Sequence, residues 1–297
     1  SYTLYENQAL LNTNATTEGP GGPGTEALYF NGEDSFAYLD HDASMNITQG
    51  TIAVWVRPDD LGETSAIVTK DHKGAQDGGH FRLGHTDDGG LILRMAEGDG
   101  GSNHTWETGP LLTEGEWTHL AVSFTEDGVT VFVDGEPVPD SAWTATEGDV
   151  AQPGDYTEAY LLANDEPWVF GADQRITEVN GTAQVFAADR EDLVNEFEGG
   201  IAGFGVWGGH STDDVLTEAE INDLIDNGPG TALTNPSGPQ PMVASDDTID
   251  GLGGNDDIDG AKAFAHPASE RNHVRIGEAD VVQGNQRERR RPGARVQ

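Results

Sequence analysis

Residues 115–138, with the sequence GEWTHLAVSFTEDGVTVFVDGEPV, constrain the fold of this chain more than any other segment. Three valines alternate with Thr130 and Phe132, which is the period-2 pattern of a strand with two different faces. Asp-Gly pairs stand before and after this run, and glycine adopts the positive φ angles of hairpin turns without steric cost. The segment therefore predicts two antiparallel strands, at 117–124 and 129–133, joined by a tight turn.

The rest of the chain extends this pattern into one large domain. The 297 residues include 40 glycines, and short alternating apolar runs are separated by repeated turn signals. These features favour an all-β fold, an antiparallel β-sandwich over residues 1–228. A sandwich of this size buries enough apolar surface to fold alone. No apolar run is long enough to span a bilayer, so we expect no membrane insertion.

Several strand motifs occur in a fixed order along the first 228 residues. They are ALYFNG at 27–32, TIAVWVRP at 51–58, IVTK at 67–70, the hairpin above, VFGA at 169–172, and a closing strand and helix at 197–221. This series resembles the laminin-G-like and pentraxin-like branch of the concanavalin A-type lectin/glucanase superfamily. The resemblance implies a jelly-roll β-sandwich with one short C-terminal helix, and a mostly noncatalytic domain that binds glycans. Where many members carry an acidic pair that holds a structural calcium, this chain has Ala202 and Gly203.

The charge of the chain excludes some classes of partner. It contains 53 acidic and 15 basic side chains, a formal net charge of -38. Such a surface repels nucleic acid and anionic membranes, so we expect neither as a partner. Adaptation to salt, calcium binding and simple surface solvation would each explain the charge. Since high salt screens self-repulsion, we favour a secreted protein from a saline or marine environment. Cysteine is absent, which excludes disulfides and thiol chemistry.

The composition changes after the sandwich. Residues 229–243 are rich in proline and glycine and predict a linker. In residues 244–260, aspartate, isoleucine and glycine recur at a spacing of nine, which resembles the RTX calcium-binding repeat of secreted bacterial proteins. The carboxylates of Asp247 and Asp256 and the turn glycines Gly251 and Gly254 are then the expected calcium ligands. The alternative is an acidic, glycine-rich linker without a metal.

Two nonapeptides make only one turn of a repeat structure. A stack of fewer than three units is rarely stable, so we expect weak calcium binding and a mostly disordered segment. Residues 261–297 contain eight Lys or Arg and four Asp or Glu, without apolar periodicity. They predict a basic, irregular and disordered tail. Such a tail could bind nucleic acid or the acidic body, but we favour an irregular continuation without a role of its own.

A cationic patch is the first candidate binding site. Five of the seven Lys and Arg residues before position 261 fall between Arg57 and Arg94. Alternation in the strands at 79–85 and 91–95 places His80, Arg82 and Arg94 on the face opposite the core, with the two arginines side by side. Guanidinium groups suit the carboxylates and sulfates of an anionic glycan. The simpler interpretation, which the acidic surface favours, is that each arginine pairs with a neighbouring carboxylate.

Two polar loops are the second candidate. The first contains Asp71 and Asp77, and the second, residues 99–106, ends at Trp106. An aromatic ring beside carboxylates or amides is a common arrangement for holding a sugar. Trp143 and Trp168 are further candidates of this kind.

Other aromatic residues in strand patterns predict structural roles. We interpret Trp55, Trp117 and Trp207 as core residues and His119 as a packed structural histidine. Neither a strand of the E-x-D-x-x-E type nor a G-x-S-x-G or H-E-x-x-H motif occurs, and retaining hydrolysis needs a close carboxyl pair. The sequence therefore favours a noncatalytic, calcium-associated glycan-binding module of a secreted RTX-type bacterial protein. A polysaccharide lyase or glycoside hydrolase, an accessory domain of one, and a structural spacer are the alternatives.

Overall fold

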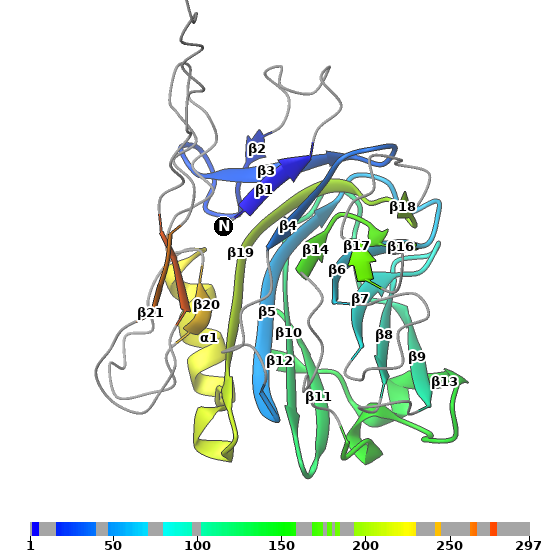
Figure 1. The fold of residues 1–297 in the computed structure, drawn as a ribbon. Helices are drawn as coiled ribbons and strands as arrows, with labels where there is room; N and C mark the ends of the chain where they lie inside the picture. The colour runs from blue at the N-terminus through cyan, green and yellow to red at the C-terminus, as the bar shows by residue number, and fades with distance from the viewer. Residues whose placement is uncertain are drawn as a thin grey trace, which may run out of the picture.

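Two antiparallel β-sheets stack face to face, with one short helix on the outside (Figure 1). The computed structural model describes residues 2–5, 16–39, 47–70, 80–96, 102–158, 168–174, 177–179, 182–184, 193–229, 241–244, 262–265 and 274–277. Within these ranges, the predicted all-β sandwich with a short C-terminal helix is confirmed, and its arrangement is that of a jelly roll.

Each large sheet has eight strands. Sheet A contains, in spatial order, β1 (Tyr2–Tyr5), β4 (Phe36–Leu39), β14 (Trp168–Phe170), β6 (Ser65–Lys70), β7 (Phe81–His85), β8 (Gly90–Ala96), β9 (Asn103–Pro110) and β13 (Trp143–Glu147). Sheet B contains β12 (Glu136–Pro137), β11 (Gly128–Val133), β10 (Thr118–Thr125), β5 (Gln49–Pro58), β19 (Glu198–Gly209), β3 (Glu26–Asn31) and β2 (Thr16–Glu18), with β20 (Pro241–Ala244) beside β19.

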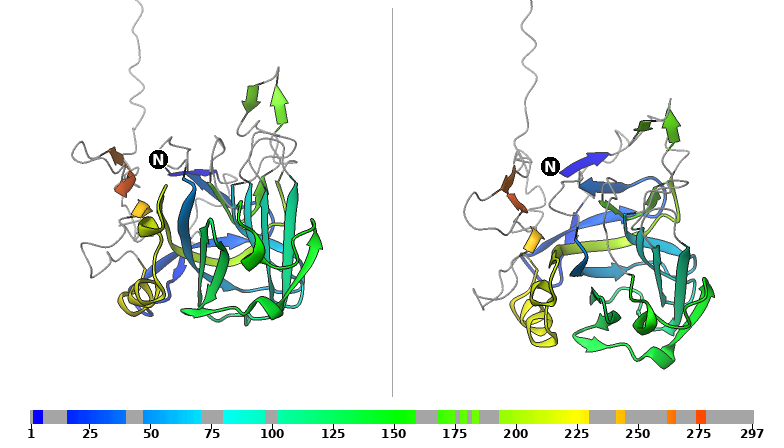
Figure 2. Two further views of the ribbon diagram at one scale, coloured as in Figure 1. Left: turned by 90° about the horizontal axis from the view of Figure 1, so that it is seen from below. Right: turned by 60° about the horizontal axis from the view of Figure 1, so that its bottom comes forward.

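Smaller elements surround the sandwich (Figure 2). Three strand pairs are β15 (Asp173–Gln174) with β18 (Leu193–Val194), β16 (Thr177–Val179) with β17 (Thr182–Gln184), and β21 (Lys262–Ala265) with β22 (Val274–Gly277). The 3-10 turns are η2 (Asp140–Ala142), η3 (Pro153–Asp155) and η5 (Thr212–Asp214). The α-helix α1 spans Glu218–Asn227.

The hairpin that dominates the sequence analysis is β10 and β11, which pair antiparallel as predicted. The second Asp-Gly pair forms the turn after β11, where Asp134 has φ 49° and Gly135 has φ 82°. A non-glycine residue in this region is uncommon, and Asp is one of the residues that tolerate it. The Asp134 carboxylate accepts a hydrogen bond from the backbone N–H of His119 at 2.8 Å, which fastens the turn to the start of β10.

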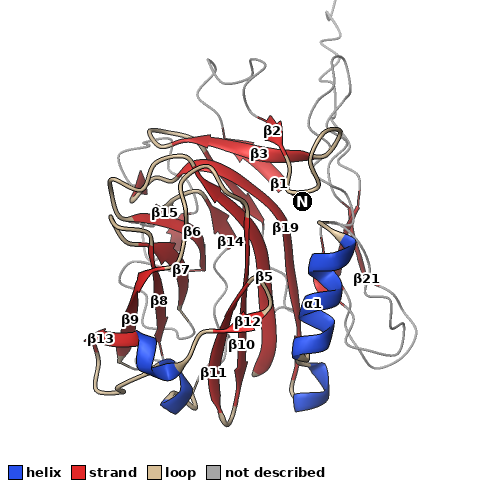
Figure 3. Ribbon diagram, turned by 180° about the vertical axis from the view of Figure 1, so that it is seen from behind, coloured by secondary structure: helices blue, strands red, loops and turns tan. Residues whose placement is uncertain are grey.

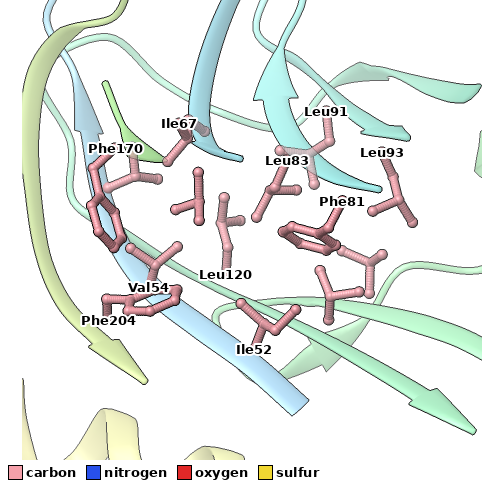
Figure 4. Close-up of a cluster of buried hydrophobic side chains, with 14 of the residues drawn as sticks. Ile52, Val54, Ile67, Phe81, Leu83, Leu91, Leu93, Leu120, Phe170 and Phe204 are labelled. Carbon is pink, nitrogen blue, oxygen red and sulfur yellow. The ribbon is translucent and has the colours of Figure 1, made fainter. Parts of the chain in front are cut away.

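The core fills the space between the sheets (Figure 4). Phe81, Leu83 and Leu93 of sheet A face Val54 and Leu120 of sheet B, and all five are fully buried. In each of these strands every second side chain points into the core, which is the alternation seen in the sequence.

The helix covers part of the outer face of sheet B (Figure 3). It begins with a capping box, in which Thr217 accepts from the N–H of Glu220 and the Glu220 carboxylate accepts from the N–H of Thr217. Ile221 packs in a second buried cluster that includes Ala53 and Ala121 of the sheet. These small side chains let the helix approach the strands closely. None of the described helices is long and apolar enough to cross a bilayer.

The C-terminal third differs from the sequence prediction in two respects. In the tail predicted to be irregular, Lys262–Ala265 and Val274–Gly277 form the antiparallel pair β21 and β22. Residues 241–243, predicted as linker, and Ala244, predicted as the start of the repeat segment, form β20 and pair with Gly205–Trp207 of β19. The reason is that β3 pairs only with residues 198–201 of β19. The later residues of β19 on that side can therefore pair with β20. Residues 245–261, which include most of the nonapeptide segment, and most of the basic tail lie outside the described residues.

Candidate functional site

Arg82 and Arg94 lie directly opposite each other on the outer face of sheet A, as the sequence predicts. In β7, Phe81 and Leu83 are core residues, so Arg82 between them faces outward. The same alternation turns Arg94 of β8 away from the core beside Leu93. The antiparallel register then makes the two arginines cross-strand partners, and like charges in this position repel each other.

Each arginine has a carboxylate neighbour. Nε of Arg82 lies 3.2 Å from Oδ2 of Asp173, and Nε of Arg94 lies 3.9 Å from Oε2 of Glu147. Nδ2 of Asn195 donates to the same Oδ2 of Asp173 at 2.6 Å, which holds that carboxylate beside Arg82. These contacts agree with the simpler interpretation of the sequence, in which neighbouring carboxylates offset the two positive charges.

The two ion pairs differ in their environment. The side chains of Arg82 and Asp173 are 14% and 13% exposed, whereas Glu147 is 53% exposed, so solvent screens its attraction to Arg94. Nε and Nη2 of Arg82 are buried, and within the described part of the chain neither meets the geometry of a hydrogen bond, although Nε lies in the ion pair with Asp173. A buried guanidinium donor without an acceptor is costly. A ligand can reach only the 14% of this side chain that is exposed, where an anionic oxygen could accept a charge-assisted hydrogen bond.

Both predicted ligand-binding loops begin and end where the strands of sheet A end, on the same side of the sheet. The first connects Lys70, the end of β6, to His80 beside β7, and the second connects Ala96, the end of β8, to β9. Antiparallel pairing places these strand ends next to each other, and N of Ala96 donates to O of His80 at 3.1 Å. Asp71 and Asp77 of the first loop lie outside the described residues.

Two cationic or titratable side chains at these strand ends are buried. His80 is 9% exposed, so most of its ring is withdrawn from solvent. Lys70 is fully buried on the core side of sheet A, with its Nζ atom 5.9 Å from the ring centroid of Trp168. The sequence analysis counted Lys70 only as part of the basic segment. Its position two residues after the buried Val68 is the signal that it faces inward.

The predicted role of Trp106 as an exposed loop aromatic is wrong. Trp106 lies within β9, between β8 and β13, and is fully buried. Its ring packs against His104 and Tyr156, and its Nε1 donates to O of Val150 at 2.9 Å. A ring enclosed in this way cannot offer a face to a sugar. Trp143 of β13 and Trp168 of β14, the other predicted sugar-binding aromatics, are also buried and belong to the core.

Two tryptophans predicted in the core lie elsewhere. Trp55 and Trp117 are only half-buried, because they belong to the outer face of sheet B, beyond the part that α1 covers. Trp207 is buried beneath the helix, as predicted. Trp55 alternates with the core residue Val54, so its outward direction could be read from the sequence.

His119 is a packed structural histidine, as predicted. It is 1% exposed, and its ring contacts the Trp55 ring edge-on with 5.1 Å between centroids. Burial lowers the pKa of His119 to about 4. Burial also lowers the pKa of His85, which is fully buried beside Phe197. Both imidazoles are therefore neutral at pH 7, and neither is placed to act as a base on a ligand.

The proposed metal ligands are not among the residues placed by the structure. Asp247, Asp256, Gly251 and Gly254 lie outside the described ranges. Within those ranges, no group of three or more His, Asp or Glu side chains could hold a metal ion. At the position of the family's acidic pair, Ala202 pairs with Trp55, and Gly203 lies against Trp55 and Pro229. This part of the sheet therefore supplies packing rather than carboxylate ligands.

A family model described as the concanavalin A-like lectin/glucanases superfamily matches residues 30–222, about two thirds of the chain. No curated protein matches the sequence significantly. The matched range begins in β3 and ends within α1, so it contains the core strands of both sheets.

Solved structures similar to this chain include three proteins of different origin. Domain 4 of an extracellular arabinanase from Geobacillus stearothermophilus, in complex with arabinotriose, is 19% identical, with 75% of this chain and 87% of that chain covered and a TM-score of 0.44. The carbohydrate-binding module of the Ruminococcus gnavus IT-sialidase, bound to α2,3-sialyllactose, is 16% identical, with coverages of 71% and 98% and a TM-score of 0.40. A heptameric pentraxin from Limulus polyphemus is 16% identical, with coverages of 60% and 70% and a TM-score of 0.37.

Proposed function

This chain belongs to the concanavalin A-like lectin/glucanases superfamily, and from that premise we propose that its sandwich is a noncatalytic module that binds a glycan. The superfamily description contains both lectins and glucanases, so family membership alone leaves binding and cleavage open. The sequence lacks the carboxylate motif of the retaining glucanases, which favours binding.

The observation that carries the proposal is the pair of directly opposed guanidinium groups on sheet A. In a chain of net charge -38, two outward arginines on neighbouring strands concentrate positive charge at one place. Among the described residues, Nη2 of Arg82 has no hydrogen-bond acceptor, and both loops predicted to contact ligand start at the same ends of neighbouring strands in sheet A. A carboxylate or sulfate of an acidic sugar matches these donors in charge and geometry.

The experiment is a screen of the purified chain against soluble neutral and anionic polysaccharides, with and without EDTA. We expect at least one uronate-containing or sulfated polymer to bind. Because each charge-assisted contact contributes about 1.5–3 kcal/mol, Arg82→Gln combined with Arg94→Gln should weaken that binding at least tenfold. Arg290→Gln with Arg291→Gln, which removes the same charge from the C-terminal segment, is the matched control and should bind normally.

Arg82 requires a check on folding, because its removal takes away an ion-pair partner of the largely buried Asp173. Arg94→Gln alone avoids this problem, since its partner Glu147 is exposed. Unchanged affinity in a folded Arg94→Gln and in the double variant would assign both arginines to packing alone. Release of reducing or unsaturated sugars by the wild-type chain would replace the binding proposal with an enzymatic one.

The proposal also includes calcium binding by the repeat segment and secretion of the protein. The spacing of nine between Asp247 and Asp256 and the nearby Gly251 and Gly254 supports weak calcium binding in an RTX-type repeat of a secreted bacterial protein. The acidic surface supports a saline or marine setting. Millimolar calcium should shift the backbone amide resonances of the repeat segment. Unchanged resonances would remove calcium from the account and leave the glycan proposal standing.

A further inference from the structure

Three aromatic side chains lie on the outer face of sheet B where α1 does not cover it. Tyr29 of β3, Trp55 of β5 and Trp117 before β10 are each half-buried, so part of each ring remains accessible. We call these three residues the aromatic face. The helix packs against the other end of the same sheet face, over Ala53 and Ala121. The aromatic face is therefore the part of this sheet surface that the helix leaves exposed.

A glycine two strands away leaves room for the edge of the Trp117 indole. Gly200 of β19 is the cross-strand partner of both Tyr29 and Arg57. A Cβ atom built on Gly200 would lie 2.7 Å from Cη2 of Trp117, which is closer than real Cβ contacts allow. The Trp117 ring therefore occupies the space that a side chain at position 200 would fill. An indole held in place at one edge, with part of the residue still exposed, can stack on the C–H face of a sugar.

Polar groups surround the rings in fixed positions. Arg57 donates to both oxygens of Asp59, at 2.9 and 3.0 Å, and to Oγ1 of Thr17 at 3.1 Å. Its guanidinium lies 5.5 Å from the ring centroid of Trp117, within the range of a cation–π contact. Because these side chains restrain one another, their remaining lone pairs and donors are preorganised for hydroxyl groups.

The same surroundings disfavour a negatively charged ligand. Burial, followed by repulsion from Asp60, Asp59 and Glu33, raises the pKa of Glu198. Burial and the nearby Glu198 raise the pKa of Tyr29, whose hydroxyl donates to that carboxylate. Burial is the larger cause of both pKa shifts, and the smaller contributions from Asp59, Asp60 and Glu33 show that carboxylates lie close to the aromatic face. Uronate or sulfate groups would be repelled here. A second copy of the chain, with its own net charge of -38, would be repelled as well.

From this combination we infer that the aromatic face binds a neutral, hydroxyl-rich polysaccharide, with sugar rings stacked on Trp117 and hydroxyls bonded to the polar groups beside it. The opposed arginines lie on the outer face of sheet A, and the aromatic face lies on the outer face of sheet B, on the opposite side of the sandwich. One molecule would therefore hold an acidic glycan on one side and a neutral glycan on the other. One site depends on guanidinium groups and the other on aromatic rings, so an experiment can refute either proposal and leave the other standing.

The test is affinity electrophoresis of the acidic chain in native gels that contain laminarin, xylan or galactomannan. The wild-type protein should be retarded by at least one of these neutral polymers. Trp117→Ala should weaken the retardation about tenfold, and Tyr29→Phe, which removes only a hydroxyl group, about threefold. Leu111→Ala removes an exposed apolar side chain outside both sites and should behave as wild type. The double variant of Arg82 and Arg94 should also keep its binding to the neutral polymer.

A second measurement does not depend on a folded variant. Four of the six tryptophans are buried, and only Trp55 and Trp117 are half-buried. A bound neutral polymer should therefore protect the wild-type fluorescence from acrylamide quenching. Absence of retardation by all three polymers, unchanged quenching with a bound polymer, or normal binding by folded Trp117→Ala would overturn the inference. A dimer of the wild-type chain that Trp117→Ala dissociates would also overturn it, by assigning the face to a second copy.

Discussion

The imidazole of His119 packs edge-on against the indole of Trp55, with 5.1 Å between the ring centroids. This contact joins β10 to β5 on the outer face of sheet B, and the histidine beneath it is almost completely buried. Burying an imidazolium here would require removing its charge from water without a partner. Burial of His119 therefore favours the neutral form and makes the stability of the sandwich depend on pH.

Acid should destabilise the protein before its carboxylates begin to titrate. The pKa of His119 falls from 6.5 to about 4 on folding, so the unfolded chain binds more protons between these values. Its contribution to stability is complete above pH 6.5 and decreases as the pH falls toward 4. The slope approaches about 1.4 kcal/mol per pH unit for each such histidine, and His85 shifts in the same direction.

Urea unfolding at several pH values between 6.5 and 5 measures this slope. His119→Leu should reduce it, and His119→Leu with His85→Leu should reduce it further. The control is the wild-type slope between pH 7 and 8, where neither histidine titrates and little change is expected. An equal slope in wild type and the double variant would contradict the assignment to these residues.

The turn at Asp134 should be sensitive to side-chain chemistry and to backbone conformation. Asp134→Ala removes the acceptor of the His119 N–H and places alanine at φ 49°, so we expect a loss of about 1–2 kcal/mol. Asp134→Asn keeps an acceptor and tolerates this φ, and should cost much less. Chemical denaturation of both variants measures the difference. Equal losses would show that neither the hydrogen bond nor the φ angle matters.

Trp106 should affect stability and not recognition. Trp106→Ala opens a large cavity beneath His104 and Tyr156, with an expected loss of about 3–5 kcal/mol. Trp106→Phe should lose less and remain folded, so its affinity for bound polysaccharide can be measured. That affinity should equal the wild-type value. A specific loss of binding in folded Trp106→Phe would restore the loop-aromatic interpretation.

Gly200→Ala tests the geometry of the aromatic face with a single methyl group. The new Cβ would displace the Trp117 ring from its place against β19, while φ at position 200 is not in the left-handed region. We expect weaker retardation by neutral polysaccharide and a shifted tryptophan emission spectrum. Gly109→Ala is the control, since a Cβ there meets no atom within 4 Å. Identical behaviour of the two variants would contradict the described packing.

Much of the fold could be predicted from the sequence because strand alternation records which side chains face the core. The same alternation predicts that Arg82 and Arg94 lie side by side, and their cross-strand pairing confirms it. It also contained the correct direction of Trp55, which stands between the inward residues Val54 and Val56. Assigning Trp55 to the core followed the hydrophobic character of tryptophan instead of its position in the strand. In this case position is the better guide.

Other features had no local signal. Trp106 lies in the run NHTWETGP, whose neighbours are mostly polar, and its burial depends on β13 and Tyr156, which come from elsewhere in the chain. The ion pair of Arg82 with Asp173 joins residues 91 positions apart and depends on how β15 returns beside β6. Such contacts are set by tertiary packing, which composition and periodicity do not encode.

The most direct test of glycan recognition at the arginine pair is an NMR titration of the arginine Nε–H resonances with alginate oligosaccharides, which are soluble uronates. The account predicts that the Arg82 and Arg94 signals shift together and saturate, while the Arg57 signal on the other sheet changes little. The titration repeated in EDTA separates this contact from any calcium effect. Saturable binding that leaves both the Arg82 and Arg94 resonances unmoved would contradict the central claim.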